Sequence, residues 1–214
     1  MSKPRKLAVL GAGGHGRVVA EAALCSGWDE VEFFDDALRS EHRIFLGPFR
    51  GSSEDLFRDI TAFDGVVVGV GGNEPRSRLV QRLMAGYASL PVIVHPAASI
   101  SRTAEIGAGS VVLAGAVVVT GARIGKGCII NTGASVDHDC TLGDWVHVSP
   151  GARLAGTVTV GDMVWVGIGA AVREGATIGK RATIGAGSTV VGDIKEGETV
   201  VGSPARPIIR QPHA

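Results

Sequence analysis

A histidine between two acids interrupts a long stretch of small and aliphatic residues. Residues 131–140 read NTGASVDHDC, and His138 lies directly between Asp137 and Asp139. A histidine has an ordinary pKa near 6.5, and a neighbouring carboxylate raises that pKa and determines which ring nitrogen carries the proton. Such a pair is typical of a general base, which takes a proton from an attacking nucleophile. The spacing alone leaves open which of the two acids pairs with the ring.

A second histidine, His147, follows nine residues later in the segment WVHVS. The repeat described below has eighteen residues per coil, so nine residues place the two histidines on different faces. Some proteins with this repeat bind zinc through three histidines across a subunit boundary. Here a third ligand would have to come from His95 or His15, and the close histidine spacing of such sites is missing. We therefore expect no metal.

A glycine-rich loop near the N-terminus is the third chemical feature. The apolar residues 6–10 run into GAGGHG, in which Gly11, Gly13 and Gly16 have the spacing of a dinucleotide-binding loop, and Asp35 follows 19 residues after the last glycine. Such a loop turns the backbone tightly and directs helix N–H groups toward a phosphate. However, this part of the chain has only about 90 residues, roughly half of a full dinucleotide fold. A mononucleotide-sized ligand therefore fits better than NAD.

A strict six-residue repeat must position the two later histidines. From Val94 to Val190 in steps of six, all 17 positions are Val, Ile or Leu. Neither the helix period near 3.6 nor the strand period of two produces this pattern. A coil with three flat faces of six residues does, and 17 faces make between five and six coils. Small residues follow four positions after each aliphatic residue, and we expect Cys128 and Cys140, which occupy such positions, to be buried.

The first 93 residues alternate between strand and helix patterns. This alternation predicts a parallel sheet with helices on both faces. Ligands of such sheets bind at the carboxyl ends of the strands, where Asn73 and Arg76 would join Gly13 and Asp35. The predicted strands cover residues 6–10, 31–34, 66–70 and 91–94, and the predicted helices cover residues 17–25 and 75–85 with a further helix beginning at Ser53 as its cap.

The composition excludes several classes of partner. The chain has 21 basic and 21 acidic residues, so nothing favours nucleic acid or an anionic membrane. No apolar run reaches the roughly 18 residues of a membrane span, and the apolar run near the N-terminus stops at glycines, unlike a signal peptide. The three cysteines have no metal or disulfide spacing. These features predict a reduced, cytoplasmic protein.

Seven segments together resemble one enzyme family, namely GAGGHG, FFDD, VVVGVGGN, VHPAASIS, NTGASVDHDC, HVSPGARLAG and VVGSPAR. This family contains the hexapeptide-repeat sugar N-acetyltransferases of bacterial glycan synthesis, such as those for UDP-4-amino sugars and GDP-perosamine. The resemblance implies a Rossmann-like nucleotide-sugar-binding domain over residues 1–93. It further implies a left-handed β-helix acetyltransferase domain with a short tail over residues 94–214, an exception to the usual right-handed crossover. A homotrimer with active sites between neighbouring prisms is also implied.

The same resemblance assigns roles to individual residues. His138 would be the general base, and Asp139, where relatives often have Glu, would raise its basicity. His147 and Asn131 would lie near the thioester of acetyl-CoA, and the backbone N–H of Gly156 would stabilise the oxyanion. The pantetheine groove would be lined by Ile168, Gly185 and Ala186, and the 3′-phosphate end of the coenzyme would lie near Lys180, Arg181 or Arg206. The nucleotide sugar would be bound by Gly13, Gly14, His15, Asp35 and Asp36, with Gly51 and Asn73 as further contacts.

These observations predict an acetyl-CoA-dependent N-acetyltransferase that acts on a nucleotide-linked 4-amino-4,6-dideoxy sugar. An alternative is an O-acetyltransferase for sialic acid or another sugar, because O-transfer needs a similar base. An NAD-binding protein or a trimeric scaffold would leave His138 and its two acids without a role. The sequence leaves open whether the nucleotide is UDP, GDP or dTDP.

Overall fold

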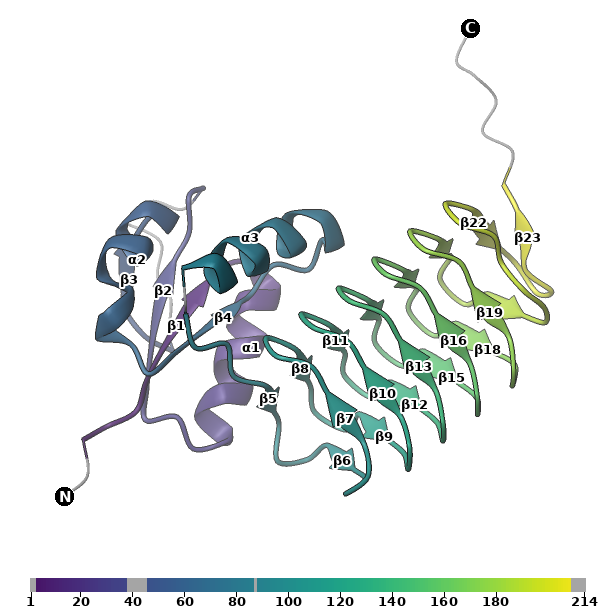
Figure 1. Ribbon diagram of the computed structural model, residues 1–214, viewed down its shortest axis with the longest axis horizontal. Coiled ribbons are helices and arrows are strands. Elements are labelled where there is room, and N and C mark those ends of the chain that lie inside the picture. Colours follow the sequence, from purple (N-terminus) through teal and green to yellow (C-terminus); the bar gives the residue numbers. More distant parts are fainter. Residues whose placement is uncertain (1–2, 38–45, 87, 209–214) are drawn as a thin grey trace, which may run out of the picture.

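The computed structural model describes residues 3–37, 46–86 and 88–208. It consists of a small α/β part and a long triangular prism, which lie side by side over the first coils of the prism (Figure 1). No helix within the described ranges is long and apolar enough to cross a membrane. The two architectures are those that the sequence predicted, although several elements begin at other residues.

The α/β part contains one parallel sheet with strand order β3-β2-β1-β4. Leu7 and Val9 pack on the side of α1, whereas Ala8 and Leu10 pack on the side of α2 and α3. Helices therefore cover both faces, as predicted. The strands are β1 (Lys6–Leu10), β2 (Glu30–Phe34), β3 (Phe49–Gly51) and β4 (Gly65–Val68), and the helices are α1 (Gly14–Cys25), α2 (Ser53–Asp59), the 3₁₀ helix η1 (Ile60–Ala62) and α3 (Asn73–Ala85).

The sequence misplaced the starts of two helices and missed one strand. Helix α1 begins at Gly14, three residues before the predicted start. Glycine has a low helix propensity, so the sequence pattern did not indicate a helix start within the loop. Helix α2 is capped by Ser52, one residue before the predicted cap, since Asp55 reaches back to the Ser52 backbone in a capping box. The short edge strand β3 has no apolar alternation and was not predicted.

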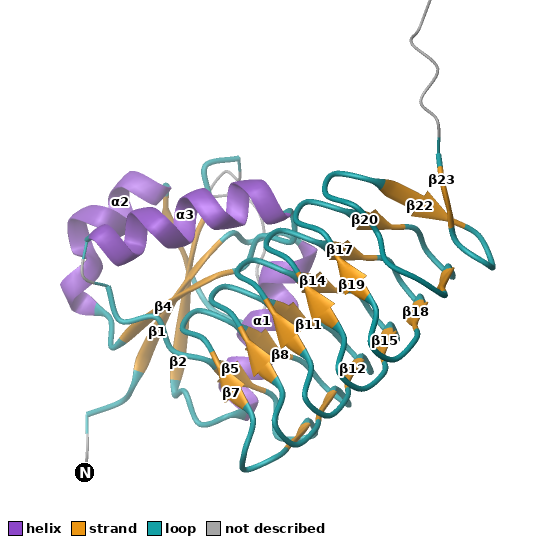
Figure 2. Ribbon diagram, turned by 45° about the vertical axis from the view of Figure 1, so that its right-hand side comes forward, coloured by secondary structure: helices purple, strands orange, loops and turns teal. Residues whose placement is uncertain are grey.

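The prism is built from strands of two or three residues that form three sheets, here called faces 1, 2 and 3 (Figure 2). Face 1 contains β5 (Ile93–Val94), β8 (Val111–Val112), β11 (Ile129–Ile130), β14 (His147–Val148), β17 (Trp165–Val166), β20 (Thr183–Ile184), β22 (Thr199–Val201) and the antiparallel β23 (Arg206–Pro207). Face 2 contains β6 (Ser99–Ile100), β9 (Val117–Val118), β12 (Ser135–Val136), β15 (Arg153–Leu154), β18 (Ala171–Val172) and β21 (Thr189–Val190). Face 3 contains β7 (Glu105–Ile106), β10 (Arg123–Ile124), β13 (Thr141–Leu142), β16 (Thr159–Val160) and β19 (Thr177–Ile178).

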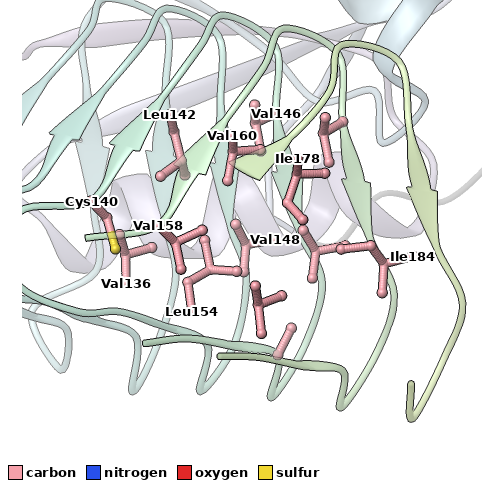
Figure 3. Close-up of a cluster of buried hydrophobic side chains, with 14 of the residues drawn as sticks. Val136, Cys140, Leu142, Val146, Val148, Leu154, Val158, Val160, Ile178 and Ile184 are labelled. Atoms are coloured by element: carbon pink, nitrogen blue, oxygen red, sulfur yellow. The ribbon is translucent and has the colours of Figure 1, made fainter. Parts of the chain in front are cut away.

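The aliphatic repeat fills the prism. From Val112 to Val190, every sixth residue is at most 4% exposed, and Figure 3 shows several of these side chains pointing into one narrow core. Burying one such side chain stabilises the fold by about 1.5–3 kcal/mol. Cys128 and Cys140 are fully buried in the same core, and burial raises the pKa of the Cys128 thiol to about 12. Both cysteines therefore act as packing residues, as predicted.

The α/β part packs against the outer side of face 1. Ile93, Val111 and Ile129 point outward from successive coils, yet each is only 1% exposed, because they pack against α1 residues such as Val19 and Ala23. A soluble prism needs no apolar side chains on the outside of its strands. The eighteen-residue spacing of these three residues was therefore a docking signal that our reading of the sequence missed.

Candidate active site

His138 lies in the turn between β12 and β13, at the corner of faces 2 and 3. Its Nδ1 lies 3.0 Å from Oδ2 of Asp139, whereas Asp137 accepts a hydrogen bond of 2.8 Å from the His138 backbone N–H. Asp139 can reach the ring of its neighbour because its backbone is left-handed, with φ = 56°. The two acids thus differ in function: Asp139 orients the ring, and Asp137 holds the turn.

The hydrogen bond to Asp139 raises the pKa of His138, and the charge of Asp137 adds to this shift. Both side chains of the pair are more than half exposed, so water screens the interaction. Because Nδ1 donates to Asp139, Nε2 is the ring nitrogen that remains free to accept a proton. His138 therefore has the tautomer of a general base.

Gly156 lies one coil below His138, directly against its ring. A β-carbon at position 156 would overlap the imidazole, so only glycine leaves room for this ring position. The N–H of Gly156 donates no hydrogen bond within the described part of the chain. A residue with a free backbone donor thus lies beside the ring of His138.

A groove of about 430 Å³ runs along the corner between faces 1 and 2. Asn131, Ser149, Gly167 and Gly185 occupy the same corner position in successive coils. The groove opens where the two glycines follow the two larger residues. Four of the residues predicted to bind acetyl-CoA line this groove together. The full lining is His147, Ser149, Pro150, Trp165, Gly167, Ile168, Thr183, Ile184, Gly185 and Ala186.

His147 closes the upper end of the groove. It is 5% exposed and packs against the indole of Trp165 at a centroid distance of 4.3 Å. Its Nε2 lies 3.0 Å from the side-chain nitrogen of Asn131, whose oxygen accepts from the Thr132 backbone. The Asn131 amide therefore donates to His147. Burial, with a smaller contribution from the charge of Arg76, lowers the pKa of His147 to about 3, so its ring is neutral.

His15, from the glycine loop, meets His147 at the junction of the two parts of the chain. Their ring centroids lie 6.2 Å apart, and burial followed by the charge of Arg76 lowers the pKa of His15 to about 4. Gly13 and Gly14 are exposed, with open space where side chains would be. Gly16 must be glycine, because a β-carbon there would overlap the carbonyl of Gly11.

The two acids after β2 stabilise neighbouring loops. Asp35 accepts a hydrogen bond of 2.8 Å from the backbone N–H of Ala12 in the glycine loop, and its own N–H donates to Gly51. Asp36 accepts from the backbone and hydroxyl of Ser53 at the start of α2. The structure thus brings Asp35, Gly51 and the glycine loop together and joins Asp36 to α2.

Asn73 and Arg76 join α3 to the prism. The Asn73 amide donates to the carbonyls of Met163 and Val164 at 2.8 and 3.1 Å, and its oxygen accepts from Arg76 at 2.8 Å. Asn73 therefore holds the two parts of the chain together, a role that the sequence did not predict. Its side chain has little hydrogen-bonding capacity left for a nucleotide sugar.

Arg76 is 1% exposed and forms the centre of this junction. Its guanidinium donates to the carbonyls of Gly71 at 2.6 Å, Gly127 at 2.8 Å and Trp145 at 2.8 Å. No carboxylate pairs with Arg76 in the described part of the chain, so backbone carbonyls and the side-chain oxygen of Asn73 compensate its charge. Burial lowers its pKa to about 10, which still leaves it charged at neutral pH.

Missing glycines at the corners of the repeat could have indicated two edges of the prism from the sequence: the edge beside His138 and the edge that α3 contacts. Between positions 109 and 187, nine left-handed corner positions carry glycine and five carry another residue. Non-glycine residues are strained in this conformation. The exceptions lie either beside His138 or along the edge that α3 contacts, and they are Asp139, Thr157, Trp145, Met163 and Arg181.

The described residues contain no group of three or more potential metal ligands. The coil geometry, with an α/β domain docked on a prism of six-residue repeats, is that of a hexapeptide-repeat transferase. Residues 6–83 match the family described as the PglD N-terminal domain, and residues 121–156 and 157–192 each match the bacterial transferase hexapeptide repeat.

Solved structures extend this match to almost the whole chain. The acetyltransferase domain of PglB from Neisseria gonorrhoeae is 43% identical, with a TM-score of 0.90 over 95% of this chain and 100% of that chain. PerB from Caulobacter crescentus, solved with CoA and GDP-perosamine, is 34% identical, with a TM-score of 0.89 over 95% of this chain and 97% of that chain. The chain belongs to the left-handed β-helix N-acetyltransferase family that these proteins represent, which confirms the predicted fold and family.

A curated relative shows the same relationship over a shorter region. The UDP-N-acetylbacillosamine N-acetyltransferase of Bacillus subtilis is 37% identical over 116 residues, which are 51% of this chain and 52% of the relative. The match thus spans about half the length of the curated relative.

Proposed function

We propose that this chain transfers the acetyl group of acetyl-CoA to the amino group of a UDP- or GDP-linked 4-amino-4,6-dideoxy sugar in bacterial surface glycan biosynthesis. The observation that carries the proposal is the ring of His138, which is oriented by Asp139 and lies beside Gly156, a residue whose backbone N–H donates no hydrogen bond within the described part of the chain. Relatives solved with acetyl coenzyme A and with GDP-perosamine support both substrates. Residues 1–93 would bind the nucleotide sugar, and residues 94–214 would bind acetyl-CoA.

The chemistry follows from these groups. The sugar amine attacks the thioester carbonyl, and Nε2 of His138 takes the proton that the amine loses. The carbonyl oxygen becomes an oxyanion that the N–H of Gly156 stabilises, and one such donor typically contributes about 3–4 kcal/mol. The carbon–sulfur bond then breaks, and CoA leaves as a thiolate that takes up a proton. The reaction needs no acyl-enzyme, and the buried thiols of Cys128 and Cys140 have no step in it.

The proposal requires a homotrimer. His138 lies at the corner of faces 2 and 3, whereas the groove lies at the corner of faces 1 and 2, so one prism places them on opposite edges of face 2. In a trimer, His138 of one prism would face the groove of its neighbour. Light scattering at micromolar concentration should therefore give about three times the 21.9-kDa mass of the chain, and a monomeric mass would contradict this arrangement.

Thiol release from acetyl-CoA tests the proposed reaction. The acceptors would be UDP-, dTDP- and GDP-linked 4-amino sugars and free sialic acid, each in a separate assay. Turnover with one nucleotide amino sugar would establish N-acetyl transfer and identify the nucleotide. Turnover with sialic acid alone would move the assignment to O-acetylation. The proposed location is the cytoplasm, where the three free cysteines would remain reduced.

A further inference from the structure

Ser149 carries a buried hydroxyl that nothing in the protein uses. The residue is 3% exposed, and its Oγ makes no hydrogen bond within the described part of the chain. Its backbone is fully paired, since its N–H donates to Val166 and its carbonyl accepts from Ala152. Buried hydroxyls normally have a partner, because an unpaired one loses its hydrogen bonds to water without replacement. This hydroxyl therefore needs an explanation.

The position of Ser149 in the prism explains what could reach it. Ser149 points outward from the corner after β14, below Asn131 and above Gly167 in the same column. The groove begins where Gly167 and Gly185 replace larger residues, and Ser149 is part of its wall. Because Ser149 lines the groove and its hydroxyl makes no hydrogen bond, no existing bond opposes rotation of this hydroxyl toward a ligand in the groove.

We infer that Ser149 is a binding residue for acetyl-CoA, whose hydroxyl donates a hydrogen bond to a carbonyl oxygen of the pantetheine arm. The inference rests on the proposed function, because that function places the coenzyme in this groove. The walls of the groove are otherwise largely apolar or glycine, and the other hydroxyl among them, that of Thr183, lies one coil below Trp165. The hydroxyl of Ser149 at the upper end would therefore set how far the arm enters. His147, the neighbouring wall residue, uses its Nε2 for Asn131.

A second buried serine provides a matched control. Ser110 is fully buried in the same prism, but its Oγ donates to the Gly125 carbonyl and accepts from the Cys128 N–H, both at 2.9 Å. Ser110→Ala removes a hydroxyl with two structural partners. Ser149→Ala removes one with none. Ser110→Ala should therefore lower the stability without changing coenzyme binding, whereas Ser149→Ala should weaken coenzyme binding without lowering the stability.

The experiment measures the dissociation constant of CoA by calorimetry and the thermal midpoint for the wild type and both variants. For Ser149→Ala we expect CoA binding about three- to tenfold weaker, a midpoint that is unchanged or higher, and a raised KM for acetyl-CoA with kcat and the acceptor KM unchanged. For Ser110→Ala we expect a lower midpoint and unchanged CoA affinity.

The outcomes separate this inference from the proposed function. If Ser149→Ala binds CoA within twofold of the wild type, or if its midpoint falls as far as that of Ser110→Ala, the inference is wrong while the proposed function stands. If the wild type does not bind CoA at all, both are wrong, because the groove then has another occupant.

Discussion

Arg76 and Trp145 are 69 residues apart in the chain, and the guanidinium of Arg76 donates a hydrogen bond of 2.8 Å to the backbone carbonyl of Trp145. This contact joins the first turn of α3 to the edge of the prism. It also places a buried positive charge beside His15 and His147, whose pKa values it helps to lower. The geometry between the glycine loop and the groove therefore depends on one arginine.

Replacing Arg76 by alanine should destabilise the protein strongly. The change leaves the carbonyls of Gly71, Gly127 and Trp145 without their donor, and each unpaired buried group costs about 1–3 kcal/mol. We expect the free energy of unfolding in urea to fall by at least about 3 kcal/mol. Arg78→Ala, on the exposed side of the same helix, is the control and should change it by less than about 0.5 kcal/mol. Equal effects of the two variants would remove Arg76 from its assigned role.

Removing the base should reduce catalysis without unfolding the protein. We expect His138→Ala to lower kcat/KM by about 10²–10⁴, because this is the usual contribution of a general base. The side chain is half exposed, so the thermal midpoint should change little. A variant that keeps kcat/KM within about threefold of the wild type would show that another group is the base.

The pH dependence of kcat/KM should report the pair of His138 and Asp139. The base works only when deprotonated, so activity falls as the pH drops below the pKa of His138, which Asp139 raises. Asp139→Asn should therefore move the acidic limb of the profile to lower pH. Asp137→Asn should move it less, because that carboxylate bonds to the backbone and not to the ring. A limb that moves equally in both variants, or in neither, would contradict this pairing.

Gly156→Ala tests the contact between Gly156 and the ring. The new methyl group would displace the His138 imidazole, and displacement of a catalytic group by about 1 Å can cost up to 10²-fold. We expect kcat/KM to fall by about 10- to 100-fold with a nearly unchanged midpoint, because an exposed ring can move aside. Gly192→Ala, where a β-carbon meets nothing within 4 Å, is the control and should keep full activity. Wild-type rates in Gly156→Ala would mean that the ring position is not important.

Stability should fall as the pH is lowered, because His15 and His147 are buried and neutral. Their pKa values of about 4 and about 3 lie below the ordinary 6.5, so below pH 6.5 the unfolded chain binds protons that the folded protein does not. Their contribution is complete above pH 6.5 and is lost progressively toward pH 3–4, by about 2 kcal/mol for each histidine at pH 5.

Urea unfolding at pH 7.5 and pH 5 measures this loss. The variant His147→Gln should lose about 2 kcal/mol less than the wild type between the two pH values, since glutamine does not titrate. Carboxylates titrate in the same range, so the difference between variant and wild type is the informative quantity. Identical pH dependence in both proteins would show that folding does not lower the pKa of His147.

The prism core and the proximity of His138 to an acid could be predicted from the sequence because both depend on local spacing. The six-residue period determines which side chains point inward, and Asp139 reaches His138 within a single turn. The starts of the helices were less predictable. Both α1 and α2 begin where loop contacts place them and not where the apolar pattern starts. The role of Asn73 was not predictable, because its partners Met163 and Val164 are about 90 residues away.

The sequence by itself therefore determined the repeat, the inward and outward sides of each strand, and the presence of His138 between two acids. Only the tertiary structure decided how the α/β part docks on face 1, which histidine is buried, and where Ser149 is left without a partner. The physical reason is that a period in the sequence specifies contacts along one coil, whereas burial and pKa shifts depend on which distant surfaces exclude water from a side chain.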